Sequence, residues 1–370
     1  MLGELEDYYL HNYTKSCDAT KFTYFDSPEF LRSTGRCIAL VSVPVNLFGF
    51  YCILTRTSKS MRQFKWCLLN LQFWTLLIDS MHSFLGTPYF FLPALVGVSV
   101  GVLSDLGVSP TAQFIIGMFV LGGEAMKVRS IDDHTCFSPG FLSSVVTLFE
   151  NRHHHILPPT EPLRIGSPRV RVLLSAFNFF LGNTYVFVST VYTDDQDRIK
   201  LRYLRTVLPC PHPAYFSRDT FAVKTGASTN WVTMTAQFCY NLIVAQMVFF
   251  ISHTVWFLRK QRTNLSKRRL RMERTFFKAS LVQVATPILV IFLPAVVMNY
   301  TTIAEIYNPA LVNLCVLAIP FHGVVATTAL ISVNEPYRRF FKSVFTSSTR
   351  KTVSASVDLM PVSTSTSCAV

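Results

Sequence analysis

Long apolar runs separated by basic segments constrain this chain more than any other feature. About 20 apolar residues are needed to cross a ~30 Å hydrocarbon core as a helix. Six runs meet or exceed that length, and a seventh, at residues 111–150, is interrupted. Only 15% of residues are charged, against roughly 25% in a soluble domain. The sequence therefore predicts an all-α, seven-transmembrane helix bundle. The six complete spans are residues 36–55, 66–92, 170–192, 231–258, 275–300 and 309–333.

The basic residues predict how the bundle is oriented. With the N-terminus outside, the segments that face the cytoplasm hold 22 of the 34 lysine and arginine residues. Basic residues favour the cytoplasmic side of a membrane. We therefore expect an extracellular N-terminus and a cytoplasmic C-terminus.

This orientation divides the chain into four parts. Residues 1–35 form an extracellular tail and residues 36–333 the transmembrane domain. Residues 334–345 are expected to form an amphipathic helix on the inner leaflet, because their apolar side chains fall at helical spacing. Residues 346–370 are rich in serine and threonine and are expected to be a disordered cytoplasmic tail. The apolar stripe of the amphipathic helix is Tyr337, Phe340, Phe341, Val344 and Phe345.

Composition and motifs exclude several classes of function. The net charge of +13 is accounted for by topology and by attraction to the anionic inner leaflet, so no nucleic-acid partner is expected. No nucleotide-binding or hydrolase motif occurs, and an enzyme is not expected. His153, His154 and His155 are consecutive and would point in different directions, which makes a poor metal site. We expect neither a metal nor a cofactor.

The outer segments carry features of the secretory pathway. Asn12 begins an Asn-Tyr-Thr sequon in the extracellular tail, and we expect it to be glycosylated. On the side predicted to be extracellular, and apart from the interrupted segment, the only cysteines are Cys17 and Cys210. Two cysteines in an oxidising compartment suggest a disulfide between the tail and the second outer loop.

Few polar side chains fall within the spans. Asp79 lies about 20 Å into the second span, at ~1.5 Å per residue, and His82 follows one turn later. An intramembrane carboxylate is by default a functional candidate, so we take both residues as candidate ligand contacts. The alternative is that Asp79 makes only structural hydrogen bonds within the bundle.

Together these features describe a G-protein-coupled receptor, but two familiar rhodopsin signatures are replaced. Glu150-Asn151-Arg152 stands at the inner end of the third span, and Pro320-Phe321-His322-Gly323 stands in the seventh. Over nearly its whole length the chain resembles the nematode serpentine chemoreceptors, most closely class H. The matching segments include residues 27–31, 48–53, 65–71, 88–89, 149–153, 208–211 and 336–338.

The resemblance implies a chemosensory receptor of the plasma membrane, in sensory cilia, that signals through a heterotrimeric G protein. Its ligand would be a small odorant or water-soluble attractant, bound among the outer halves of the helices. Pro88, Tyr89 and Phe90 are then expected to supply walls of the ligand site. The candidate G-protein contacts are Asn151, Arg152, Arg268, Arg269 and Arg271. For Arg152 the alternative is a topology anchor.

Two other classes of membrane protein remain alternatives. A seven-helix ligand-gated channel would be equally apolar, although the insect-receptor type has a cytoplasmic N-terminus. A transporter should show internal repeats and discontinuous helices, and the sequence has no such repeat.

The third span carries an unexpected charged insertion. Residues 111–122 and 141–150 would form about 18 Å and 15 Å of helix, so neither half crosses the membrane alone. The five charges between them would cost about 2.5 to 3.5 kcal/mol for each Asp, Lys or Arg near mid-bilayer. Codons for residues 123–124 and 137–140 can supply in-frame splice-donor and splice-acceptor sequences. We therefore predict that residues 123–139 are a retained intron; the alternative is a genuine charged loop.

Overall fold

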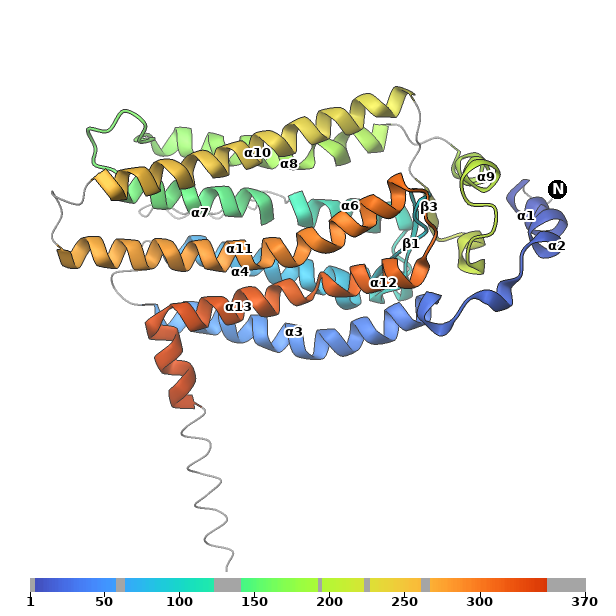
Figure 1. Ribbon diagram of the computed structural model, residues 1–370, viewed down its shortest axis with the longest axis horizontal. Helices are drawn as coiled ribbons and strands as arrows, with labels where there is room; N and C mark the ends of the chain where they lie inside the picture. The colour runs from blue at the N-terminus through green and yellow to red at the C-terminus, as the bar shows by residue number, and fades with distance from the viewer. Residues whose placement is uncertain are drawn as a thin grey trace, which may run out of the picture.

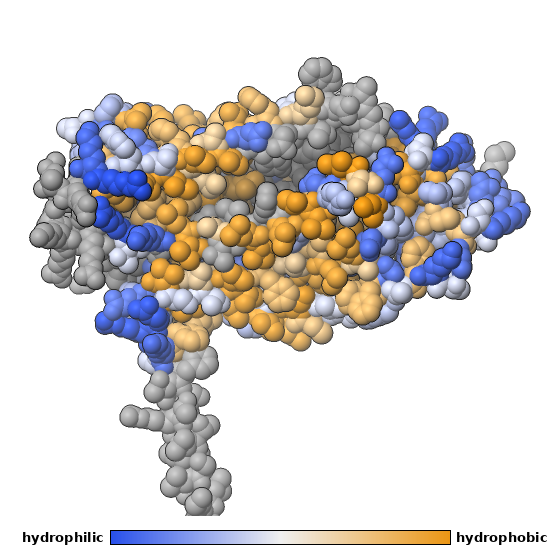
Figure 2. Space-filling view, viewed as in Figure 1, coloured by the Kyte–Doolittle hydropathy of each residue, from blue (hydrophilic) through white to orange (hydrophobic). Residues whose placement is uncertain are grey.

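The computed structural model describes residues 4–57, 64–122, 141–191, 195–222, 227–260 and 267–344. Long helices run side by side and form a bundle, with short helices and strands gathered at one end (Figure 1). On the visible face, apolar side chains form a broad belt between two hydrophilic ends (Figure 2). A bundle that crosses a bilayer presents such a belt to the hydrocarbon and its polar ends to water.

Three of the described helices are long and apolar enough to span a membrane unaided. They are Pro28–Arg56, Asn241–Lys260 and Pro309–Val333. The first forms α3 (Pro28–Arg56), which begins before the predicted start at residue 36. Ser27 caps it, because its side chain accepts a hydrogen bond from Phe30 N (3.1 Å). Pro28 occupies the first turn, where a missing N–H is tolerated.

The second span is shorter than predicted. Helix α4 (Lys65–Ser80) continues as a π-helical turn, η5 (Met81–Leu85), and ends there. The backbone N–H groups of Gly86 and Thr87 both turn back to Met81 O, at 3.0 and 2.9 Å. Pro88 then begins strand β1 (Pro88–Phe90). The prediction of a helix to residue 92 was therefore wrong, because the chain reverses before the proline and the proline takes the first position of a strand.

The third span is formed by two helices, α6 (Pro110–Gly122) and α7 (Phe141–Ile156). They lie end to end in the bundle and contact each other (Figure 1). Both also pack against α4 and against α8 (Pro168–Val191). The two halves together therefore occupy the place of one span, between the second span and the fourth. The predicted retained intron, residues 123–139, lies outside the described residues.

Helix α8 is the fourth span, and the three remaining spans follow it in the chain. Helix α10 (Ala227–Lys260) is the fifth and α11 (Lys267–Ile303) the sixth. The seventh is divided into α12 (Pro309–Ala318) and α13 (Phe321–Val333). Pro320 causes this break, since it has no N–H to continue the helical hydrogen bonds. Instead Ile319 N donates to Val316 O (3.2 Å) and His322 N to Ile319 O (3.0 Å).

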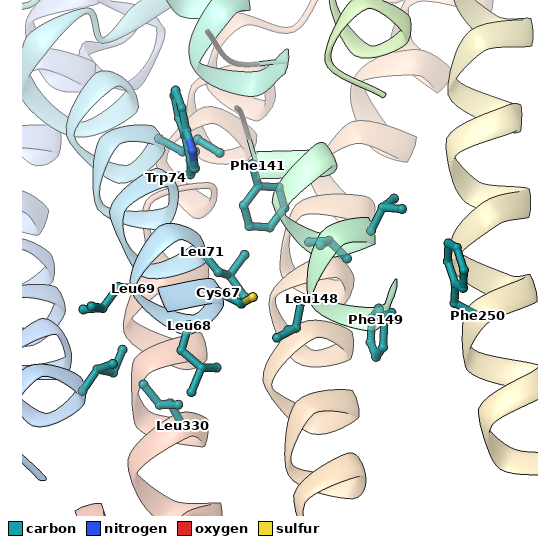
Figure 3. Close-up of a cluster of buried hydrophobic side chains, with 14 of the residues drawn as sticks. Cys67, Leu68, Leu69, Leu71, Trp74, Phe141, Leu148, Phe149, Phe250 and Leu330 are labelled. Carbon is teal, nitrogen blue, oxygen red and sulfur yellow. The ribbon is translucent and has the colours of Figure 1, made fainter. Parts of the chain in front are cut away.

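A buried apolar cluster fills the interior of the bundle. Leu68 and Leu71 of α4 lie toward Leu148 of α7, and Phe250 of α10 and Leu330 of α13 complete the cluster (Figure 3). Because lipid tails are as apolar as these side chains, close packing rather than exclusion of water stabilises this region.

One end of the bundle, which the predicted topology places outside the cell, carries a folded unit that we call the outer cap, and we call the opposite end the inner end. It contains a three-stranded antiparallel sheet in the order β1-β2-β3, which an all-α description does not include. Strands β1 and β2 come from the first outer loop, and β3 from the second. The cap comprises α1 (Glu4–Tyr8), η1 (Tyr9–Tyr13), α2 (Thr14–Ser16), η2 (Ala19–Lys21), η3 (Tyr24–Asp26), β1, β2 (Val96–Ser99), α9 (Gln196–Thr206), η6 (Pro213–Phe216) and β3 (Thr220–Ala222).

At the inner end a short helix covers residues 335–344 and turns away from the bundle axis (Figure 1). Tyr337 is fully buried and its hydroxyl lies 2.9 Å from Thr57 Oγ1. Phe340 stacks on Phe48 of α3, with ring centroids 6.2 Å apart. Phe345, the last residue of the predicted apolar stripe, lies outside the described residues.

Candidate functional site

Asp79 lies at the centre of a buried polar network that joins three spans. Asn46 of α3 donates from Nδ2 to Asp79 Oδ2 (2.6 Å). His322 of α13 places Nδ1 2.7 Å from Asp79 Oδ1, and both side chains are fully buried. A carboxylate in such surroundings is retained only when it is paired and hydrogen-bonded.

Amide and hydroxyl groups extend the network along the bundle. Thr327 of α13 donates to Asn46 Oδ1 (2.8 Å). Gln72 of α4 donates from Nε2 to the same oxygen (3.0 Å) and lies 2.8 Å from Thr327 Oγ1. Asn46, Gln72, Thr327 and His322 were not predicted as site residues, because the prediction inside the spans started from the carboxylate of Asp79 and the histidine one turn after it. Amides within long apolar runs were the sequence signal that could have identified Asn46 and Gln72.

Close packing of α13 on α4 depends on Gly323. A Cβ atom at this position would overlap the carboxylate of Asp79 and the amide of Asn46. Glycine is therefore required for His322, its neighbour, to reach Asp79. Phe141, the first residue of α7, lies edge-on to the His322 ring at 5.7 Å and covers the pair from the third span.

His82 makes its hydrogen bond within its own helix rather than to Asp79. His82 lies in η5, and its Nδ1 is 3.0 Å from the backbone oxygen of Ile78. It is half-buried. The contact stays within its own helix, one turn back.

The predicted aromatic wall lies in the outer cap instead of within the helices. Tyr89 is fully buried, and its hydroxyl donates to Asp26 O (2.6 Å). Its ring packs edge-on against Phe91 at 5.0 Å, and Phe91 packs in the same way against Tyr215 at 5.1 Å. Pro88 and Phe90 pair with residues of β2. These side chains build the cap core, so they do not line the helical interior beside Asp79.

The tail is fixed to the second outer loop at one edge of the cap. Cys17 and Cys210 form a disulfide. Beside it, Tyr13 is buried and donates from its hydroxyl to Pro211 O (2.6 Å). Asn12, the predicted glycosylation site, is exposed on the neighbouring turn of η1.

His212 lies two residues after Cys210 and joins this part of the second outer loop to η6 and to Tyr307. Its backbone N donates to the hydroxyl of Tyr307 (2.8 Å), and its Nδ1 accepts from Ala214 N (3.2 Å), which caps η6. Burial lowers the pKa of His212, while the carboxylates of Glu29 and Asp26 oppose this shift. The cap is therefore built around the neutral imidazole.

At the inner end, Glu150 and Asn151 are held by the fourth span. Arg171 of α8 donates to both carboxylate oxygens of Glu150, each at 2.7 Å, and to Asn151 Oδ1 at 2.8 Å. Asn151 in turn lies 3.2 Å from Cys67 Sγ of α4. The fork of the guanidinium suits this bidentate contact.

Arg152 faces the interior in this structure. Only 2% of it is exposed, and its guanidinium carbon lies 3.5 Å from the centre of the Phe64 ring. Phe64, at the entrance to α4, is itself 1% exposed. The other predicted coupling residues, Arg268, Arg269 and Arg271, lie in the first turns of α11, and their side chains are outside the described part of the chain.

Comparison with solved structures identifies the fold. The fold is similar to that of squid rhodopsin, with a TM-score of 0.50, 13% sequence identity and coverage of 85% of this chain and 84% of that chain. The molecule thus has the seven-transmembrane fold of G-protein-coupled receptors. Sequence comparison then places it within that class.

The chain belongs to the serpentine type 7TM GPCR chemoreceptor Srh family, whose model matches residues 26–131 and 135–347. It is 27% identical over 350 residues to serpentine receptor class H-72 of Caenorhabditis elegans, across 94% of each chain. As a member of this family it is a multi-pass receptor of the plasma membrane. The match is interrupted at residues 132–134, inside the insertion of the third span.

Proposed function

We propose that this receptor binds a small odorant or water-soluble attractant among the outer halves of its helices and activates a heterotrimeric G protein at its inner face. One observation carries the proposal. Both partners of the Asp79–His322 pair are connected to the outer cap by short segments, so a change at the cap reaches the centre of the bundle from two sides.

The first connection runs along the second span. From Asp79 the chain passes through the π-helical turn η5 and directly into β1 of the cap sheet. π-Helical turns are frequent at functional sites. Gly86 and Thr87 fold back on Met81 at the end of this turn, so β1 and η5 are joined tightly.

The second connection runs along the seventh span. His322 follows the Pro320 break, and α12 above it packs against β1 and η3. Asn313 of α12 donates from Nδ2 to Phe25 O (2.9 Å), and Ala310 N donates to Asp26 Oδ1 (3.1 Å). A ligand that shifts α12 relative to η5 would therefore change the geometry of the pair.

Such a ligand must bind two arrangements of the bundle unequally, because equal affinity shifts nothing. In the arrangement described here, Arg152 is covered by Phe64 and Glu150 is paired with Arg171. We propose that the signalling arrangement uncovers Arg152 and Asn151 for a segment of the G protein, with the basic start of α11 beside them.

Asp79→Asn tests this proposal, because it keeps the side-chain shape and removes the charge. Cells that express the receptor with a promiscuous G protein are screened with odorants and water-soluble attractants. We expect a guanine-nucleotide-dependent response that Asp79→Asn reduces strongly at equal surface expression. Asp105→Asn is the matched control, since Asp105 is exposed and pairs with Arg32 and Arg36 on the outer surface. A ligand-evoked current without nucleotide exchange would contradict the proposal and favour a channel.

The proposed orientation places the cap outside the cell and, in a sensory neuron, at the ciliary membrane. It predicts a glycan on Asn12 that disappears in Asn12→Gln, and a tail that protease reaches only from outside. A cytoplasmic tail would reject both the orientation and the receptor mechanism.

A further inference from the structure

A groove runs between the fourth and fifth spans, at the end of the bundle opposite the outer cap. Its volume is about 890 Å³, which is within the range of small-molecule sites. Helix α8 supplies Val170, Leu174 and Phe177, which lie on one face at i, i+4 and i+7. Helices α8 and α10 lie side by side and form its walls (Figure 1).

The residues of α10 that line the groove also recur at helical spacing. Leu242, Ala245, Gln246 and Phe249 line the groove at i, i+3, i+4 and i+7. Ala245 is exposed, and its methyl group leaves the space that a larger side chain would fill. Gln246 holds the two walls together, because it exchanges two hydrogen bonds with Asn178 of α8, at 3.1 and 2.7 Å.

The position of this groove limits what can fill it. Val170 and Phe177 are each about half exposed, at 50% and 51%, within a transmembrane span. Val170 is the first residue of the predicted span, and Phe177 lies about 10 Å further in, where the surroundings are hydrocarbon and water does not hydrate an apolar groove. Hydrocarbon chains are therefore the natural occupant.

The cytoplasmic end of the groove is positively charged. Arg164 lines it, and its guanidinium is fixed to the end of α7: Nε donates to His154 O (3.0 Å) and Nη2 lies 3.2 Å from His154 Nε2. These contacts engage two of its five N–H groups. Arg169 is exposed in the first turn of α8. Glu161 is the only acid in residues 157–167, and Glu150 is already paired with Arg171.

We propose that this groove is a binding site for an anionic phospholipid of the inner leaflet. One acyl chain lies between α8 and α10, and the headgroup phosphate lies at Arg164. The assignment to the inner leaflet rests on the proposed orientation, but not on the external ligand or on the G protein. Because Arg164 holds the end of α7, the bound lipid would also stabilise the segment that carries Asn151 and Arg152.

Photolabelling of the full chain in phosphatidylcholine vesicles tests the site. Two probes are compared, phosphatidylserine and phosphatidylcholine, each with a photoreactive group in one acyl chain. We expect phosphatidylserine to label the peptides around Leu174 and Ala245 about fivefold more than phosphatidylcholine does. That preference corresponds to about 1 kcal/mol, the contribution of one basic residue near an anionic headgroup.

Two pairs of variants separate the parts of the site. Ala245→Trp fills the groove and should abolish the preferential labelling, while Val248→Trp, on the same helix and exposed outside the groove, should keep it. Arg164→Gln should equalise the two probes, and Arg164→Lys should restore the preference. If Ala245→Trp does not fold, Ala245→Leu gives a smaller loss.

Equal labelling of the wild type by both probes would overturn the proposal, because it indicates ordinary boundary lipid. Unchanged labelling in Ala245→Trp would also overturn it. A glycosylated Asn12 together with equal labelling rejects this inference alone, whereas a cytoplasmic tail rejects the orientation and with it the assignment to the inner leaflet.

Discussion

The two ends of this receptor are held together in different ways. The outer cap has its own apolar core, in which Tyr89, Phe91, Leu204 and Tyr215 are buried, and a disulfide closes it. The inner end has no disulfide among the described residues, and there polar contacts such as Glu150–Arg171 and Arg152–Phe64 join the packed apolar helices. Burial stabilises the cap through the hydrophobic effect. At the inner end, separate contacts can break one at a time, which suits a surface that must change shape.

Removing the disulfide should have the largest effect. Cys17→Ser or Cys210→Ser is expected to destabilise the cap by about 2 to 5 kcal/mol and to reduce surface delivery or ligand response. The double variant should be little worse than either single one, because both remove the same bond. Surface labelling of intact cells and thermal unfolding measure the effect. Free thiols at both positions in surface protein would show that the cap does not depend on this link.

Breaking the Glu150–Arg171 pair should have the next largest effect on stability and signalling. Arg171→Gln leaves a buried carboxylate without its charged partner and should cost about 1.5 to 3 kcal/mol, the range for a hydrogen bond to a charged group. We expect raised signalling without ligand, because the pair holds the third and fourth spans in the arrangement described here.

Arg339→Gln is the control for that change, since it removes one partner of an exposed ion pair, with Glu335, at the same end of the bundle. Basal nucleotide exchange in membranes measures the difference. If Arg171→Gln signals less than the wild type in the presence of ligand and no more in its absence, the pair supports the active arrangement instead.

The Arg152–Phe64 contact predicts a smaller effect. Phe64→Leu keeps an apolar side chain but removes the ring, and a cation–π contact is worth about 0.5 to 2 kcal/mol. It should therefore raise basal signalling several-fold. Arg152→Ala should lower G-protein activation while ligand affinity and surface expression stay largely intact. We expect the same result when the charges of Arg268, Arg269 and Arg271 are removed together in a separate variant. Unchanged signalling in Arg152→Ala would make this residue a topology anchor.

The smallest effect is expected from pH at the outer cap. Since burial lowers the pKa of His212 below its ordinary value of 6.5, the folded cap binds fewer protons than the unfolded chain. The stability that the neutral imidazole contributes is complete above about pH 6.5 and is lost as the pH falls through the folded pKa. The protection factors of the cap amides in hydrogen exchange, which are corrected for the slower intrinsic exchange in acid, should fall on acidification, and less so in His212→Gln. A pH response unaffected by this change would assign it to another group.

Much of the bundle could be predicted because its signal is local. The apolar length of a span is a property of consecutive residues, since each helix satisfies its own backbone hydrogen bonds in lipid. Asp79 was identified in the same way, as a carboxylate in an apolar run. The extent of the second span was misjudged, because apolar residues 88–92 serve equally well in a helix or in a buried strand. The pairing of β1 with β2 decides between them.

What the sequence by itself determined is the class of this protein: seven apolar spans, the bias of basic charge, the family motifs and a carboxylate inside the second span. Only the tertiary structure decided which side chains share a site. It brings Asn46, Gln72 and His322 to Asp79, and it moves Tyr89 away from Asp79 into the cap. The physical reason is that membrane insertion depends on the hydropathy of each segment. The partner of a buried polar group depends instead on how segments far apart in the chain pack against each other. Gly323 has no side chain and so allows α13 to approach Asp79 and Asn46. A hydropathy pattern does not record this effect.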